Sequence, residues 1–171
     1  RVPASFCGLY GIRPTHGRLP LDGMAPQAPT SDTTGWFARD GDTFALTSAV
    51  MLGEPVADDA RPSMLVVATD AFGFADDGVA AALAPLVDRL KALSGTVRED
   101  LLAPQGLSTW ARAQRAIQPY EAWKTFEAWV DQYNPRMTFT VARGLIAGAS
   151  IPTAERTWAG YMRTEARARL R

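Results

Sequence analysis

The chain has 171 residues, enough for one domain with a sizeable buried core. Lys+Arg and Asp+Glu are balanced at 18 each, so nothing in the charge favours a nucleic acid or an anionic membrane as partner. No stretch approaches the roughly 18 apolar residues of a membrane span, and the single cysteine, Cys7, excludes an internal disulfide. We expect a soluble protein of a reducing compartment, the cytoplasm.

The first segment, residues 1–35, is rich in proline and glycine and is expected to be mostly loop. Short strands fit at Leu9–Arg13 and Gly35–Arg39. Apolar spacing then predicts a helix from Asp42 to Leu52, which Asp40 or Asp42 would cap and Gly53 would end.

A strand, a helix and a second strand follow. The stretch SMLVVATD predicts a buried strand at Met64–Ala68. A helix with one apolar face is expected from Asp76 or Asp77 to a stop at Gly95, and TVRED supplies the next strand. This order is typical of a crossover unit in an α/β sheet.

The remainder, from Ser108, is expected to be helical. Pro119 should kink or divide its first run, and two further helices are predicted in TFTVARGLIAGA and TAERTWAGYMRTEARARL. The last pattern stops at Arg171 without a cap, which suggests a cut end.

The N-terminal stretch RVPASFCGLYGIRPTHGRLPLDGMAP, followed by SDTTGWFARD, resembles the amidase signature family. That family has a Gly-Gly-Ser-x-Arg loop, then Pro-x-x-Phe-Cys-Gly and Gly-x-x-Pro-Thr-x-Gly-Arg. In this chain Arg1 would close the loop, while the two later motifs fall at residues 3–8 and 11–18.

Within the family, SDTTGWFARD looks most like amidases that resemble indole-3-acetamide hydrolase. Amidotransferase subunits more often have Gly-Pro where this chain has Gly35-Trp36. In the helical tail the resemblance rests on Gln118 and on Glu121-Ala122-Trp123.

The resemblance implies an α/β fold with a mixed β-sheet between α-helices, of which the chain would be the C-terminal part, truncated at both ends. Residues 1–171 would be a partial domain. Its segments would be the downstream part of the signature (1–40), a helix with the strand-helix-strand unit (41–106) and a helical segment (107–171).

Family members hydrolyse amides with a serine nucleophile, a second serine in a cis peptide, and a lysine. By resemblance the nucleophile would stand two positions before Arg1 and the other two residues further upstream, so no catalytic residue is expected in this chain. The 171 residues alone should therefore be inactive. The resemblance implies C–N hydrolysis of a small-molecule amide without a cofactor, and the scattered carboxylates offer no metal-ligand spacing.

Four residues of the loop after the signature, Pro26, Gln27, Ala28 and Asp32, are candidates to line the acyl pocket, by resemblance. The alternative is a tight proline-rich connection, in which Asp32 would form an Asx-type turn with Thr34. Arg1 would either brace the nucleophile loop through backbone carbonyls or contact substrate.

Two other groups of residues have both a functional and a structural interpretation. Cys7 and His16 form a nucleophilic pair on one interpretation, but we favour a small buried cysteine and a surface histidine. The aromatic side chains of the tail either wall an aryl-binding pocket or, as we favour, fill the core: Trp110, Trp123, Phe126, Trp129 and Trp158.

Two rival functions stay open at this point. One is the A-type subunit of a glutamyl-tRNA amidotransferase. The other is a binding or docking module that has lost its catalytic residues. A homodimer of the whole protein is also left open.

Overall fold

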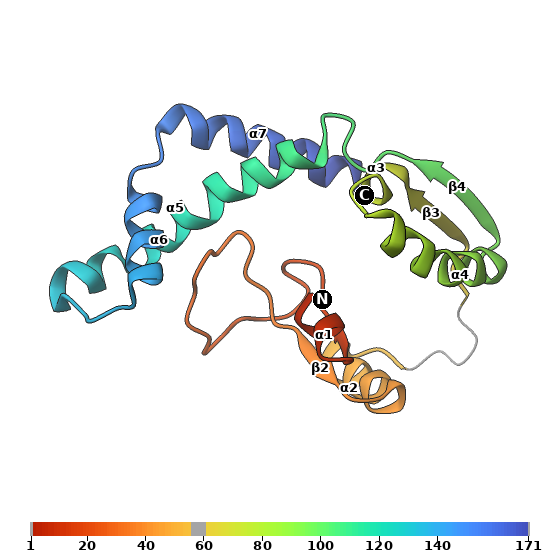
Figure 1. Ribbon diagram of the computed structural model, residues 1–171. Coiled ribbons are helices and arrows are strands. Elements are labelled where there is room, and N and C mark those ends of the chain that lie inside the picture. Colours follow the sequence, from red (N-terminus) through yellow and green to blue (C-terminus); the bar gives the residue numbers. More distant parts are fainter. Residues whose placement is uncertain (1, 56–60, 171) are drawn as a thin grey trace. The chain divides into compact units, whose positions relative to one another are not determined.

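The computed structural model describes residues 2–55 and 61–170, which form helices and short strands of an α/β fold (Figure 1). The chain divides into two compact units. Unit 1 comprises Arg1–Asp58 and Gln118–Ala149, and unit 2 comprises Asp59–Ile117 and Ser150–Arg171. Each unit is therefore built from two separate segments.

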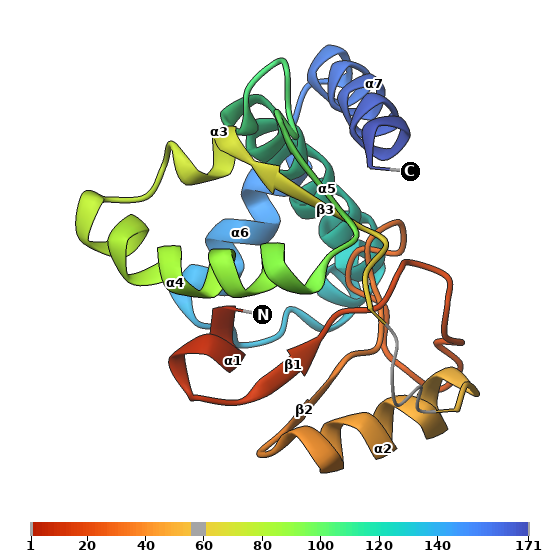
Figure 2. The same ribbon diagram turned by 90° about the vertical axis from the view of Figure 1, so that its right-hand side faces the viewer.

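Unit 1 begins with a helix and an antiparallel strand pair, seen side by side in Figure 2. These are α1 (Val2–Phe6), β1 (Tyr10–Ile12) and β2 (Trp36–Ala38), with Tyr10 opposite Ala38. Both predicted strands are confirmed. The short helix α1 was not expected, although proline is tolerated in the first turn of a helix, where Pro3 stands.

Helix α2 (Gly41–Leu52) has the ends that the sequence predicts. The Asp40 carboxylate accepts the Thr43 backbone N–H at 2.8 Å, and this bond lowers the pKa of Asp40. Gly53 ends the helix with a φ of 67°, a conformation in which a side chain would be strained.

Unit 1 is completed by the second half of α5 (Leu107–Tyr133) and by α6 (Phe139–Ala149). Helix α5 runs through Pro119 as one element, so of the two outcomes that we expected at this proline, a kink or a division, the division does not occur. The buried Gly148 lies against the backbone of Pro119: a Cβ at residue 148 would overlap the Pro119 carbonyl oxygen and lie 2.6 Å from its carbon. Glycine thus lets α6 approach α5 closely.

Unit 2 contains the predicted crossover unit. Strands β3 (Met64–Ala68) and β4 (Thr96–Asp100) pair in parallel, and α3 (Thr69–Phe72) and α4 (Asp77–Leu93) connect them (Figure 1). Strand β3 is half-buried rather than buried. The apolar face of α4 is substantially exposed, with Leu86 at 53%.

Hydrogen bonds join the segments that follow β3 and β4. The Asp70 carboxylate accepts the backbone N–H groups of Ala103 at 2.9 Å and Leu102 at 3.1 Å. The bond from Ala103 is the main reason that the pKa of Asp70 is lowered. Asp100 accepts from Arg169, 2.7 Å away, which likewise lowers its pKa.

The core of unit 2 lies between the first half of α5 and α7 (Thr153–Arg169), which run side by side in Figure 1. Ala159 is fully buried and packs with Ala113, Ala116 and Ile117. Among the residues that the structure describes, no helix has the length and apolar character needed to cross a bilayer.

Candidate functional site

The loop after the signature, residues 26–34, is closed by Asp32. Its carboxylate accepts the backbone N–H of Gln27 at 2.8 Å and that of Ala28 at 2.9 Å. The backbone N–H of Asp32 in turn donates to the Ala28 carbonyl at 2.9 Å. Asp32 therefore braces the loop, as the alternative of a tight connection predicts, but its partners lie earlier in the chain, at Gln27 and Ala28, rather than at Thr34.

The same loop is bound to α5. Thr30 donates its backbone N–H to Glu121 Oε2 at 3.1 Å and its hydroxyl to Glu121 Oε1. Four residues further along α5, the Thr125 hydroxyl donates to the Gln27 carbonyl at 3.3 Å. Because residues 121 and 125 are one helical turn apart, a single face of α5 holds the loop at two points, Thr30 and Gln27.

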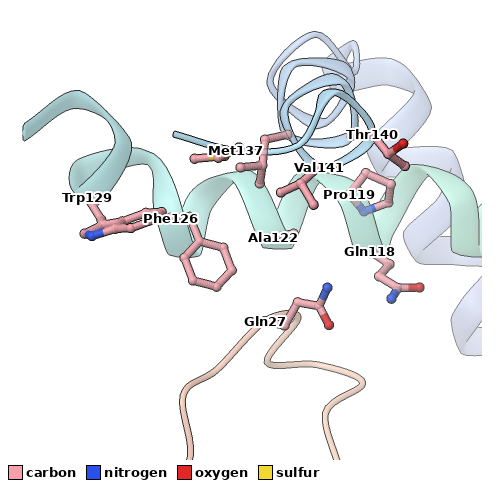
Figure 3. Close-up of a pocket in the computed structure, with 11 residues that line it drawn as sticks. Gln27, Gln118, Pro119, Ala122, Phe126, Trp129, Met137, Thr140 and Val141 are labelled. Carbon is pink, nitrogen blue, oxygen red and sulfur yellow. The ribbon is translucent and has the colours of Figure 1, made fainter. Parts of the chain in front are cut away.

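A pocket of about 380 Å³ lies where this loop meets α5 and α6 (Figure 3). Its lining is mainly apolar, with polar groups from two glutamines and a threonine. The lining residues are Gln27, Gln118, Pro119, Ala122, Phe126, Trp129, Met137, Thr140, Val141, Gly144 and Leu145. We call this the α5–α6 pocket. Its size falls within the range typical of small-molecule sites.

The four loop candidates occupy different positions. Gln27 lines the α5–α6 pocket and, with Pro26 and Asp32, a second hollow of about 370 Å³. Ala28 is 1% exposed and packs inside the loop. A role beside the acyl group stays a prediction for all four. Arg1 lies outside the described residues.

Cys7 is exposed, so the prediction that it is buried is wrong. It follows the short helix α1, and the turn continues into β1 through Gly8, whose φ is 62°. A ring nitrogen of His16, Nε2, lies 3.0 Å from the Pro29 carbonyl oxygen, and His16 is at the surface as expected. In the described part of the chain, no hydrogen bond joins Cys7 to His16, and the nucleophilic pair has no support.

Some of the aromatic residues line the pocket, and others pack in the interior of their unit. Phe126 and Trp129 line the α5–α6 pocket with their rings edge to face, 6.3 Å between centroids. Trp158 packs against the core of unit 2, where the Arg112 guanidinium lies 4.5 Å from its ring centre. Trp110 also belongs to unit 2, while Trp123 lies beside Gly148 in unit 1.

Sequence reasoning missed the part that the polar residues of α5 and α6 play. Gln118 and Glu121 were noted only as points of resemblance, yet one lines the pocket and the other binds Thr30. Apolar periodicity alone could not find Thr125 or Thr140, because their contribution depends on which loop lies opposite.

Comparison with known proteins shows that the chain is similar to amidases. The sequence model of the Amidase family matches residues 1–83. Amidase 1 from Arabidopsis thaliana is 44% identical over 72 residues, which are 42% of this chain and 17% of that protein.

Two further relatives are named as a translocon component and as an indoleacetamide hydrolase. Translocon at the outer membrane of chloroplasts 64, from Pisum sativum, is 39% identical over 72 residues, which are 42% of this chain and 12% of that protein. Indoleacetamide hydrolase from Agrobacterium vitis is 42% identical over 55 residues, 32% of this chain and 12% of that protein.

The fold also matches a solved structure described as the crystal structure of amidase. The TM-score is 0.81 at 24% identity, over 99% of this chain and 39% of the other. The predicted α/β fold class is thereby confirmed. The matches span only 12–17% of the length of the three relatives described.

Proposed function

The chain belongs to the amidase signature family, and from this premise we propose that the whole protein hydrolyses small carboxamides to a carboxylate and ammonia or an amine. The observation that carries the proposal is the signature segment itself, followed by a loop that Asp32 and Glu121 hold against a pocket of small-molecule size.

Amide hydrolysis makes three demands on a protein. The nucleophile needs a base, the tetrahedral oxyanion needs hydrogen-bond donors, and the departing nitrogen needs a proton. We propose that a serine two positions before Arg1, a second serine in a cis peptide and a lysine, all upstream, meet the first and last demands. A lysine serves as base near pH 7 only when its surroundings lower its pKa by several units.

The described residues would contribute the wall of the site rather than its reacting groups. Hydrogen bonds hold segment 26–32 both internally, from the Gln27 and Ala28 N–H groups to Asp32, and to α5, from Thr30 to Glu121 and from Thr125 to the Gln27 carbonyl. A wall fixed in this way positions a substrate without ordering cost at the moment of reaction.

The test is an assay of the whole protein for ammonia release from a panel of small amides. Replacing the proposed upstream serine by alanine should abolish turnover, since loss of a catalytic serine costs on the order of a millionfold. The 171-residue chain alone should be inactive. Unchanged turnover in the alanine variant would contradict the proposed triad.

A second candidate is a docking module without catalysis, favoured by the relative named for a chloroplast outer-membrane translocon. The two candidates differ at the proposed triad. A coding sequence that lacks either serine or the lysine favours docking, and one that holds all three favours hydrolysis. We propose a cytoplasmic location, from the balanced charge and the single cysteine.

A further inference from the structure

The loop after the signature is also held by the signature motif at residues 11–18. The Arg13 guanidinium donates a hydrogen bond from Nη2 to the Ser31 carbonyl. Nε2 of His16 lies 3.0 Å from the Pro29 carbonyl oxygen. The motif that by family resemblance follows the nucleophile loop therefore also binds the segment that is expected to line the acyl pocket.

Helix α5 holds the same loop at positions that alternate with these. Glu121 binds Thr30, and Thr125 binds the Gln27 carbonyl. Along the loop, residues 27 and 30 thus contact α5, while residues 29 and 31 contact the signature motif. All of these residues belong to unit 1. The loop is therefore held between two elements of one compact unit.

Most of these contacts use backbone atoms of the loop. The carbonyls of Gln27, Pro29 and Ser31 accept hydrogen bonds, and the Thr30 N–H donates one. The side chains that fix the loop therefore belong largely to the motif and to α5. Loop side chains are left to face the hollows on either side of them, as Gln27 does where it points toward α5 in Figure 3.

Two of the side chains that hold the loop are ionised, Arg13 and Glu121. Hydrogen bonds to an ionised group are roughly twice as strong as bonds between neutral groups. Arg13 binds the carbonyl of Ser31, and Glu121 binds the N–H and the hydroxyl of Thr30, so the two charges hold adjacent residues. Loss of either one should let this stretch of the loop move.

We propose that Arg13 and Glu121 are positioning residues for the proposed amide hydrolysis, on which this role rests: acting only through the loop, they hold it as one unit where it orients the substrate for attack. Neither residue touches the substrate or transfers a proton in this role. A displacement of about 1 Å in a reacting geometry can cost on the order of a hundredfold in rate. Both residues should therefore affect turnover through the place of the loop.

Two variants each weaken one of these anchors. Arg13→Met keeps the length of the side chain without its donors, and because Arg13 is exposed, water can replace it on the Ser31 carbonyl and the fold should survive. Glu121→Gln keeps one acceptor oxygen for Thr30.

Each anchor variant has a matched control away from the loop. Arg98→Met removes the exposed arginine of an ion pair with Asp100 in unit 2. Glu127→Gln removes a carboxylate that pairs with Lys124 on α5.

The whole protein is assayed with acetamide, butanamide and hexanamide, and kcat is expressed per folded molecule. With the best of these substrates, each anchor variant should lower kcat about tenfold or more and change KM by less than about threefold. Both control variants should leave the two constants unchanged. Arg13→Lys, which keeps a donor for Ser31, should recover part of the loss. A merely structural role would lower stability and leave kcat per folded molecule unchanged.

A double variant that combines Arg13→Met with Glu121→Gln tests whether the two anchors act on one loop. Its loss in kcat should be smaller than the product of the two single losses, because a loop released at one anchor has already left its place. Losses that multiply would overturn the claim that the loop is held as one unit.

Failure of the positioning role and failure of the amidase proposal give different results. An amidase whose kcat is insensitive to both anchor variants overturns the positioning role and leaves the amidase proposal intact. If wild type hydrolyses no small amide, hydrogen exchange of the loop is measured instead. The Thr30 N–H should then exchange about tenfold faster in Arg13→Met than in wild type or Arg98→Met, because release at Ser31 loosens its neighbour. Equal exchange in all three proteins overturns the joint action of the two anchors.

Discussion

Thr30 gives both of its donors to one carboxylate: its backbone N–H and its hydroxyl bind the two oxygens of Glu121, 91 positions later in the chain. Charge-assisted bonds of this kind are roughly twice as strong as neutral ones. One side chain on α5 thus fixes the middle of the loop that carries Gln27 into the α5–α6 pocket.

Glu121→Ala should lower the free energy of unfolding by about 1–3 kcal/mol, because two donors of Thr30 lose their partner in a half-buried place. Glu121→Gln keeps one acceptor oxygen and should cost less. Urea denaturation measures both changes. The control on the same helix is Glu127→Ala, which removes an exposed ion pair with Lys124 and should shift stability by less than about 1 kcal/mol. Equal effects at 121 and 127 would show that the Thr30 bonds contribute nothing.

Gly148→Ala should push α6 away from α5, since the added Cβ would lie 2.6 Å from the Pro119 carbonyl carbon. Overpacking of this kind costs about 1–3 kcal/mol or more. Gly144→Ala, one turn earlier on the same helix, adds a Cβ in open space and should be neutral or stabilising by up to about 1 kcal/mol. Thermal unfolding of the two variants makes the comparison. A Gly148→Ala protein as stable as wild type would refute the close crossing of the helices.

Gly35→Ala should weaken the β1–β2 pair, because a Cβ at residue 35 would overlap the Ile12 carbonyl oxygen. The expected loss is again about 1–3 kcal/mol. Gly41→Ala, at the start of α2, brings its Cβ no closer than 3.9 Å to Tyr10 and is the neutral control. Amide hydrogen exchange at Tyr10 and Ile12 reports on the strand pair directly, and unchanged protection in Gly35→Ala would contradict the prediction.

The Asp70 carboxylate makes the stability of unit 2 depend on pH. The Ala103 N–H holds the pKa of Asp70 below its ordinary value, so the folded state binds this proton less readily than the unfolded state. The stabilisation is present above the unfolded pKa of about 4 and is lost as the pH falls through the lower folded value.

Asp70→Asn removes this dependence. The variant should be less stable than wild type at pH 7, and the difference should shrink steadily below about pH 4. Urea midpoints measured between pH 7 and pH 2.5 give the result. A difference that stays constant across this range would exclude Asp70 as its source.

Much of the fold followed from local signals in the sequence. The ends of α2 were predicted because Asp40 caps and Gly53 stops a helix by contacts within one turn. The β3–α4–β4 unit was predicted from periodicity and order alone. Short α1 escaped detection, since Pro3 is usually a breaker and only its place in the first turn allows a helix.

The site was harder to predict because its contacts are not local. Nothing around Asp32 indicates that its carboxylate turns back to Gln27 and Ala28 rather than forward to Thr34. Pairing of Thr30 with Glu121 depends on how the chain returns after the intervening Asp59–Ile117 segment of unit 2. Cys7 was expected to be buried from its apolar neighbours, but the turn after α1 leaves it exposed.

The division of unit 1 into Arg1–Asp58 and Gln118–Ala149 has a consequence for biosynthesis. A ribosome delivers Thr30 well before Glu121, with the Asp59–Ile117 segment made in between. During that interval the segment 26–34 has no helix to bind. Long-range closure of this kind slows folding and leaves apolar surface open to aggregation. Translation speed through Asp59–Ile117, or a chaperone acting then, should therefore govern the yield of native protein.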